Sequence, residues 1–313
     1  MKKLILNSYA KLNLYLLVLN KRGDNYHNIK TVFERIDLSD KIILTPRQDN
    51  KIKIISSARN IPKDSSNLAY RSAKLLQNRF NINRGADIKI IKHIPVGGGL
   101  GGGSSNAASV LVGLNKLWGL NLDRDKLAGL AKKIGCDVPF FIYNAPFALG
   151  VARGDRIRIL NFLDKVRLWH ILAVPKTEVS TELIYNKWDI AMKSFKGTLR
   201  KLFGRESSGI LKKAGLTRPS CDVKILTSVL RKKDLFLVSK ALFNSLQEVT
   251  AKLYPEVARI KEKLGILGVK AILMSGSGPA IFGIAHSRKE AVSLCRQLRE
   301  ENKSWRVFTT STI

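Results

Sequence analysis

The chain has 313 residues, enough for one large domain or two medium ones with a substantial core. Its hydrophobic fraction of 45% excludes a disordered protein. The 55 Lys and Arg residues against 24 Asp and Glu residues give a net charge of +31, which raises the question of an anionic partner such as nucleic acid, a membrane surface or a phosphorylated substrate.

The first part of the chain mixes strands with helices. Leu12, Leu14, Leu16 and Val18 recur at every second position, which predicts a strand with one buried face. The polar and glycine-containing residues 21–25 predict a turn after it. Further strands are predicted at residues 31–36, 41–44 and 86–91, and a helix at residues 67–79.

A glycine-rich segment then joins a strand to a helix. Six of the seven residues from Gly97 to Gly103 are glycine. Ser104, Ser105 and Asn106 follow, and because these residue types cap helix N-termini, we expect the helix to begin there. A second helix is predicted at residues 123–134 and a short apolar element at residues 138–143.

A domain boundary is predicted near residues 155–166, where a strand at 156–160 gives way to one at 168–174. The tract 187–233 is rich in Lys and Arg and contains four glycines, which predicts short helices and loops. Beyond it, helices are predicted at residues 235–246, 255–264 and 288–300, and strands at residues 271–275 and 280–284.

The three cysteines show neither a disulfide framework nor a zinc site. Cys136, Cys221 and Cys295 are odd in number and no two have CxxC spacing, so we expect a protein of the reducing cytoplasm. No stretch reaches 18 apolar residues, so no membrane span is expected. The first six residues lack the apolar core and cleavage site of a signal peptide, and we interpret them as part of the mature protein.

The glycine-rich segment predicts a phosphate site. Glycine allows positive φ and a close approach of backbone N–H groups to a ligand, and the start of a helix attracts an anion. The segment matches the Gly97-x-Gly99-x-x-Gly102 pattern of dinucleotide-binding loops, but almost any run this rich in glycine would match it. No acidic residue follows at the distance that such loops require, so a dinucleotide-binding loop is not indicated. A Walker A loop is also excluded, because no lysine precedes Ser104. A flexible hinge is the remaining alternative.

Three segments, in order, resemble the motifs of the GHMP kinase superfamily. Residues 95–107 resemble its phosphate-binding motif, residues 8–14 its first motif and residues 274–279 its third, a second glycine-rich loop. The resemblance spans nearly the whole chain. It implies an α+β, two-domain fold, with an N-terminal ATP-binding half at residues 1–160 similar to ribosomal protein S5 domain 2 and an α+β C-terminal half at residues 161–313.

The resemblance further implies transfer of the γ-phosphate of ATP, with Mg²⁺, to a small-molecule hydroxyl. Asp137 matches the catalytic base of the family, although a turn or helix-cap aspartate is the alternative. Lys11 matches the lysine that keeps this carboxylate ionised and stabilises the attacking oxygen. A lysine between Ala10 and Leu12 on an apolar strand is also costly to bury unless it is paired.

The resemblance assigns ATP to the glycine-rich segment and its flanks. The residues are Pro95, Val96, Gly97, Gly98, Gly99, Leu100, Gly101, Gly102, Gly103, Ser104 and Ser105. Asn67 matches a position near the adenine, with a helix N-cap as the alternative. No metal ligand is assigned, Ser104 or Ser105 being the nearest candidates. Ser275, Gly276, Ser277 and Gly278 are expected to support the phosphate site.

Within the superfamily, Asn25-Tyr26-His27 and residues 135–140 resemble the branch that phosphorylates the 2-hydroxyl of a cytidine diphosphate-linked methylerythritol for non-mevalonate isoprenoid synthesis. Tyr26 would stack on the cytosine, and the imidazole or backbone of His27 would read its polar edge. Three more substrate contacts are implied: Asn13 to the methylerythritol part, Thr181 on the substrate side of the cleft, and Tyr185 as a second aromatic face, unless it packs in the core.

Three residues depart from the pattern of this branch. Tyr9 replaces a proline, Asn25 a glycine and Ser245 an aspartate. A homoserine-type or mevalonate-type kinase therefore remains an alternative, and so does a basic nucleic-acid-binding protein on an S5-like fold, although no basic helix with interleaved aromatic residues supports it. The expected partners are ATP and a small-molecule substrate, with no membrane contact, for a monomer or a homodimer.

Overall fold

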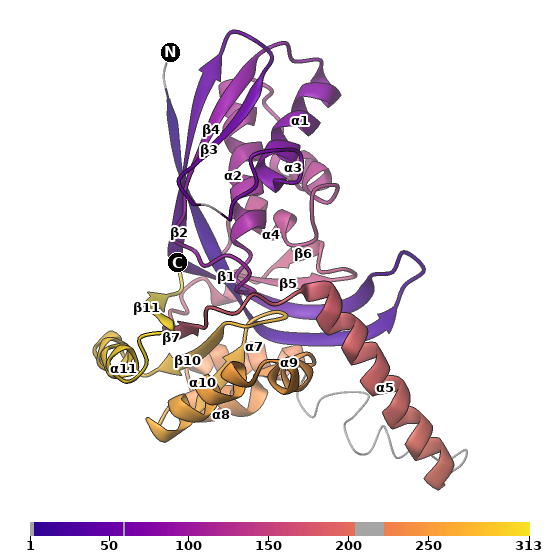
Figure 1. Ribbon diagram of the computed structural model, residues 1–313, viewed down its shortest axis with the longest axis vertical. Coiled ribbons are helices and arrows are strands. Elements are labelled where there is room, and N and C mark those ends of the chain that lie inside the picture. The colour runs from indigo at the N-terminus through magenta and orange to yellow at the C-terminus, as the bar shows by residue number, and fades with distance from the viewer. Residues whose placement is uncertain (1–2, 59, 204–221) are drawn as a thin grey trace.

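The computed structural model of the protein describes residues 3–58, 60–203 and 222–313 (Figure 1). Helices pack against two β-sheets, which confirms the predicted α+β class. The first sheet has seven strands, with the path β3-β4-β2-β1-β8 and with β5 and β6 attached through β2. The second sheet has four strands in the order β11-β7-β10-β9.

Two long antiparallel strands form the centre of the first sheet. β1 (Leu4–Lys21) pairs with β2 (His27–Arg47), and the predicted turn between them is confirmed. The segments predicted as separate strands at 31–36 and 41–44 are therefore one strand. The polar residues between them do not end it because Asp40, although fully buried, accepts hydrogen bonds from the backbone N–H groups of His93 and Ile94.

The remaining strands of this sheet are short. β4 (Gly85–Ile91) and β6 (Arg156–Ile159) were predicted, whereas β3 (Ile52–Ser56) and β5 (Phe147–Val151) were not. β8 (Phe243–Asn244) comes from the second half of the chain and pairs with β1 in parallel. The helix predicted at 235–246 consequently ends early, as α8 (Leu235–Ala241). The boundary between residues 160 and 161 stays a prediction, and it falls between β6 and β7.

Four helices lie on one side of the long strands (Figure 1): α1 (Leu68–Phe80), α2 (Gly102–Leu117), α3 (Arg124–Ala131) and α4 (Val138–Tyr143). The predicted start of α2 at Ser104 was wrong. Gly101 occupies the N-cap position in a left-handed conformation, with no side-chain cap. Ser105 lies inside the helix, and its hydroxyl accepts a hydrogen bond from Ser8 on β1.

The second sheet consists of β7 (Trp169–Val174), β9 (Ala271–Met274), β10 (Ile281–Ala285) and the unpredicted β11 (Arg306–Ser311). Successive side chains of its strands point to opposite faces of the sheet, and both faces are buried. Ile171 packs in one cluster with α10 (Pro255–Ile266) and α11 (Arg288–Glu301). Leu172 packs in another with α7 (Val223–Lys232), α8 and Leu12 of β1. The two sheets therefore share a core, and α9 (Gln247–Leu253) and a 3₁₀ turn at Asn161–Leu163 complete this half.

The prediction of short helices and loops over residues 187–233 was wrong in its first part. Residues 187–203 belong to α5 (Thr181–Phe203), a single helix of 23 residues that projects from the body of the protein in Figure 1. Lys and Arg favour helix, and a single glycine inside a helix costs only about 1 kcal/mol, so Gly197 does not end it. Residues 204–221, including Cys221, lie outside the described residues. In the described part of the chain, no helix is both long enough and apolar enough to cross a bilayer.

Candidate active site

A pocket of about 830 Å³ lies between β1, the glycine-rich segment and the start of α5. It brings together most of the predicted site residues, which are distant in the sequence. Those that line it are Lys11, Asn13, Tyr26, His27, Asn67, Pro95, Val96, the seven residues 97–103, Ser104, Asp137, Thr181, Tyr185, Gly276 and Ser277. Ser105, Ser275 and Gly278 are buried and do not line it.

Positive φ and close packing coincide at two glycines of the segment 97–103. Gly99 and Gly101 both have positive φ values, of 72° and 68°. A Cβ atom on Gly99 would lie 2.4 Å from the carbonyl oxygen of Ser275, and one on Gly101 would lie 3.0 Å from Cγ of Lys11. Because α2 begins at Gly102, the free N–H groups of its first turn lie next to the pocket and form the kind of site that binds a phosphate.

The second glycine-rich loop supports the first through Ser275. The buried Ser275 hydroxyl donates a hydrogen bond to the carbonyl oxygen of Gly99 (3.2 Å) and accepts one from the backbone N–H of Asn13 (3.2 Å). The Asn244 amide donates to the carbonyl oxygens of Met274 and Gly276, both at 2.8 Å. The loop is therefore fixed to β1 and to the glycine-rich segment without itself placing the Ser275 hydroxyl in the pocket.

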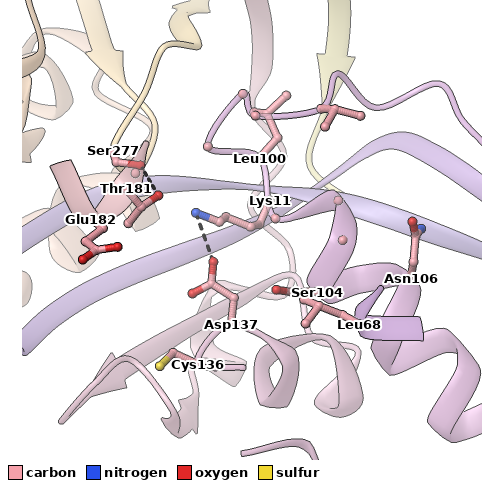
Figure 2. A pocket seen from close by; sticks show the side chains of 18 of the residues that line it. Lys11, Leu68, Leu100, Ser104, Asn106, Cys136, Asp137, Thr181, Glu182 and Ser277 are labelled. Carbon is pink, nitrogen blue, oxygen red and sulfur yellow. Dashed lines mark hydrogen bonds and ion pairs between the residues drawn. The ribbon is translucent and has the colours of Figure 1, made fainter. Parts of the chain in front are cut away.

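Lys11 and Asp137 face each other in the middle of the pocket (Figure 2). Nζ of Lys11 lies 3.5 Å from Oδ2 of Asp137, and the lysine side chain is 4% exposed against 32% for the aspartate. Nζ also donates to the side-chain oxygen of Asn13, and the backbone N–H of Lys11 donates to the carbonyl oxygen of Leu100 (3.0 Å). Burial lowers the pKa of Lys11, and the charge of Asp137 opposes that shift.

The carboxylate of Asp137 is free of the helix that follows it. Asp137 occupies the N-cap position of α4, but its side chain makes no capping hydrogen bond. The alternative of a cap aspartate is therefore not supported.

The neighbour of Asp137, Cys136, which was not predicted as a site residue, also lines the pocket. Burial and the nearby Asp137 raise the pKa of the Cys136 thiol to about 11, so it stays protonated at neutral pH.

Aromatic rings form the end of the pocket where the β1–β2 hairpin meets α5. The His27 ring is buried, with the Tyr185 ring centroid at 5.0 Å and an interplanar angle of 31°. Burial raises the pKa of Tyr185, so its phenol stays neutral. Tyr26 is 52% exposed, and the Arg153 guanidinium lies 5.1 Å from its ring centroid. One aromatic ring is thus open to stack on a ligand.

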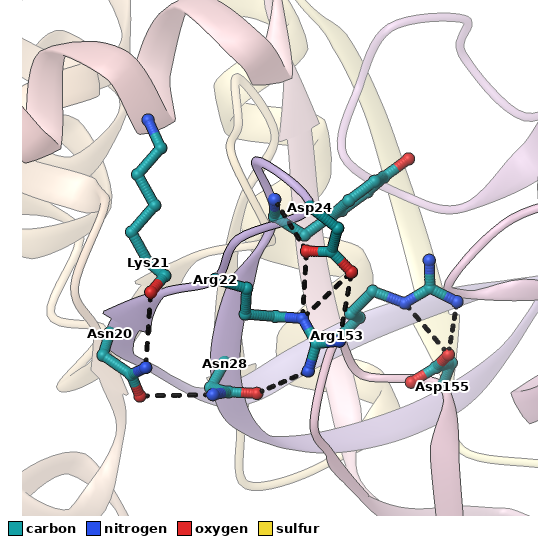
Figure 3. Close-up of polar contacts among 8 residues, drawn as sticks. Asn20, Lys21, Arg22, Asp24, Asn28, Arg153 and Asp155 are labelled. Carbon is teal, nitrogen blue, oxygen red and sulfur yellow. Dashed lines mark hydrogen bonds and ion pairs between the residues drawn. The ribbon is translucent and has the colours of Figure 1, made fainter.

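Polar contacts fix the hairpin that presents Tyr26 (Figure 3). Arg22 donates hydrogen bonds through Nε and Nη2 to the carboxylate of Asp24, and this carboxylate also accepts the backbone N–H of Tyr26 at 3.2 Å. Arg153 is held by Asp155 at 2.7 Å. Asn25 adopts a left-handed conformation with φ of 63°, a conformation that asparagine tolerates well, so its replacement of the usual glycine leaves the turn intact.

The remaining predicted residues near the pocket also have defined contacts. Asn67 does cap α1, because its side chain accepts from the backbone N–H of Ala69 (2.9 Å), and it also lines the pocket. The Thr181 hydroxyl contacts that of Ser277 at 2.8 Å. Ser104 faces the pocket, whereas Ser105 is buried against Ser8, so of these two serines only Ser104 can reach a ligand.

The sequence did not indicate several other residues of the pocket. The polar ones include Arg153, Glu182 and Asn186, together with Lys92, whose ammonium pairs with the buried Asp40. None of these residues lies in one of the three motifs.

Comparisons with known proteins show similarity to one family over most of the chain. The family model for the GHMP kinases N terminal domain matches residues 67–145, and that for the GHMP kinases C terminal domain matches residues 226–304. A 4-diphosphocytidyl-2-C-methyl-D-erythritol kinase from Geobacillus sp. (strain WCH70) is 43% identical over 90% of this chain and 88% of its own. A protein of the same name from Bacillus cereus (strain B4264) is 40% identical over 91% of this chain and 89% of its own.

Solved structures show the same similarity. The crystal structure of a 4-(cytidine 5'-diphospho)-2C-methyl-D-erythritol kinase has a TM-score of 0.76 and 28% identity, and covers 98% of each chain. A homoserine kinase from Cytophaga hutchinsonii has a TM-score of 0.69 at 19% identity, covering 100% of this chain and 95% of that one, which shows the fold alone.

The contact between the two glycine-rich loops predicts different effects for two Gly→Ala substitutions. Gly99→Ala and Gly119→Ala both place an L-residue at positive φ, at a cost of about 1–2 kcal/mol. A Cβ at Gly119 meets nothing within 4 Å, whereas one at Gly99 forces the loops apart. We expect Gly99→Ala to weaken ATP binding at least about tenfold in titration calorimetry, or about 1.4 kcal/mol. Gly119→Ala should leave it unchanged, and equal losses in both variants would contradict the interpretation.

Proposed function

Because this chain belongs to the GHMP kinase family, we propose that it transfers the γ-phosphate of ATP to the 2-hydroxyl of 4-diphosphocytidyl-2-C-methyl-D-erythritol in isoprenoid precursor synthesis. The observation that supports this most is the ion pair between the buried Lys11 and the partly exposed Asp137, which lies in one pocket with a phosphate-type glycine loop and an aromatic end. The similarity to kinases of that name over 90% of the chain supports the substrate.

The glycine-rich segment is suited to hold the phosphates of ATP. Phosphoryl transfer depends mainly on positioning and on stabilising the charge of the transferred group. The N–H groups of the first turn of α2 and the dipole of that helix supply partial positive charge without a lysine in the loop. Among the described residues that line the pocket, the lysines and arginines are Lys11, Lys92 and Arg153, so the net charge of +31 is not concentrated there.

Asp137 is the proposed acceptor of the proton of the attacking hydroxyl. Its carboxylate is partly exposed to the pocket and makes no capping hydrogen bond, so it is free to receive a proton. The ammonium of Lys11 beside it stabilises the oxygen that becomes negative as the proton leaves. Asn13 completes the group by fixing the direction of that ammonium.

The Mg²⁺ that accompanies ATP is proposed to bind chiefly to the phosphates. The described residues contain no cluster of three His, Cys, Asp or Glu side chains able to hold a metal ion. This fits Mg²⁺, which keeps several waters and is commonly held by one or two protein groups and the phosphates of the nucleotide. Ser104, which faces the pocket at the start of α2, is the proposed protein ligand. When bound, the ion neutralises charge on the phosphates.

The aromatic end of the pocket is proposed to bind the cytosine. Tyr26 offers the exposed face of a ring for stacking, and the guanidinium of Arg153 covers part of that ring. His27 and Tyr185 form the wall next to it. A homoserine or mevalonate substrate has no base that would use such an end, so this feature favours the cytidine-linked substrate.

A substrate panel tests the proposal. The purified protein with ATP and Mg²⁺ should release ADP with the diphosphocytidyl substrate and not with homoserine or mevalonate. Asp137→Asn should lower kcat by about 10²–10⁴ because the base is lost. The control Asp125→Asn, which changes an aspartate that contacts the Tyr143 hydroxyl, should leave kcat unchanged. Faster turnover of homoserine or mevalonate, or full activity of Asp137→Asn, would refute the assignment.

The burial of Lys11 predicts a loss of activity at alkaline pH. Burial lowers the pKa of Lys11 below its ordinary value of 10.5, and the cation is present only below that pKa. We expect kcat/KM to fall as the pH rises through this lowered value. In Lys11→Arg, whose guanidinium stays charged, the residual activity should persist to higher pH. An identical alkaline limb in both proteins would show that another group controls it.

A further inference from the structure

Asp189 of α5 contacts the ring of His27 through its carboxylate. Oδ1 of Asp189 lies 2.8 Å from Nε2 of His27, and Oδ2 lies 3.0 Å from Nζ of Lys21. The residues come from α5 and from both strands of the β1–β2 hairpin, so this contact joins the helix to the hairpin. The Lys21 side chain points away from the other polar contacts of the hairpin in Figure 3, which leaves it free to reach Asp189.

We infer that Asp189 selects the tautomer of His27 that recognises the exocyclic amino group of cytosine, and that it thereby makes the site reject uracil. This inference rests on the proposed function, and it names Asp189 as a positioning residue rather than one that touches the substrate.

The carboxylate determines which nitrogen of His27 bears the proton. Burial alone would raise the pKa of Asp189, but the hydrogen bonds from His27 and Lys21 lower it, so the side chain is ionised at neutral pH. An ionised carboxylate only accepts hydrogen bonds, so Nε2 of His27 must carry a hydrogen. In the neutral ring Nδ1 is then an acceptor; His27 lines the pocket, and Nδ1 is the ring nitrogen that does not contact Asp189.

The surroundings of the ring keep it in this orientation. His27 is 5% exposed, with Tyr185 at 5.0 Å on one side and the Trp188 ring edge-on at 5.9 Å. A flip that exchanged the two nitrogens would break the bond to Asp189. The ionisable groups that the hairpin and α5 bring against it are Asp189, its partner Lys21 and the neutral Tyr185.

A fixed acceptor distinguishes the two pyrimidines. Cytosine bears an amino donor at the position where uracil bears a carbonyl oxygen. Nδ1 of His27 can accept from the amino group, whereas it repels the carbonyl oxygen. Hydrogen bonds of this kind discriminate between bases by about 1–3 kcal/mol, so we expect a preference of about 5- to 150-fold for the cytidine substrate.

The test compares Asp189→Asn with Asp222→Asn. An amide of the same shape can accept or donate, so Asp189→Asn no longer enforces one tautomer. Asp222→Asn is the matched control, because Asp222 also joins a helix to the hairpin strand through a lysine, Lys30 at 2.6 Å, and asparagine is an equally good N-cap. Each protein is assayed with the cytidine-linked and the uridine-linked diphosphate of methylerythritol, and ¹⁵N NMR reports the tautomer of His27 without any substrate.

We expect the neutral His27 ring of the wild type and of Asp222→Asn to carry its hydrogen on Nε2. In Asp189→Asn both tautomers should appear, and the preference for cytidine should fall about tenfold through KM, with kcat within about threefold. A hydrogen on Nδ1 in the wild type, or an undiminished preference in Asp189→Asn, would overturn the inference. Failure of the proposed function gives a different result, because the wild type would then phosphorylate neither substrate while the NMR spectra still decide the tautomer.

Discussion

The buried ammonium of Lys11 is the constraint on which the rest of the site depends. Taking a lysine out of water is costly unless the charge is paired and hydrogen-bonded. Asp137 pairs with the ammonium, and Asn13 accepts a hydrogen bond from it. Both residues are themselves fixed, because Asn13 donates to Thr31 at 2.8 Å and Asp137 directly precedes the buried helix α4. Because Lys11 and Asn13 are two residues apart on one strand, both side chains face the same side.

The same strand also positions the phosphate loop. The backbone of Lys11 bonds to Leu100, and that of Asn13 bonds to Ser275, which in turn bonds to Gly99. Residues separated by more than 250 positions in the chain are thereby assembled around one charge. This explains why residues 99 and 101 are glycine, since a side chain on Gly99 would collide with the second loop and one on Gly101 with Lys11 itself.

The sequence predicted the parts of the site whose chemistry is local. Lys11 stands out on an apolar strand, and the glycine run by itself indicates a phosphate site. Features that arise from tertiary contacts were missed. The continuity of β2 depends on the hydrogen bonds of Asp40, the burial of Ser105 depends on Ser8, and the contact of Asp189 with His27 joins residues 162 positions apart. Helix α5 was missed because a dense tract of Lys and Arg with glycines resembles a loop in composition.

The most direct measurement is a crystal structure of the protein with the diphosphocytidyl substrate and a non-hydrolysable ATP analogue. We expect the terminal phosphate against the N-terminus of α2 beside Lys11, the 2-hydroxyl within hydrogen-bonding distance of Asp137, and the cytosine against Tyr26 and His27. Phosphates bound away from residues 97–103, or a 2-hydroxyl directed away from Asp137, would contradict it.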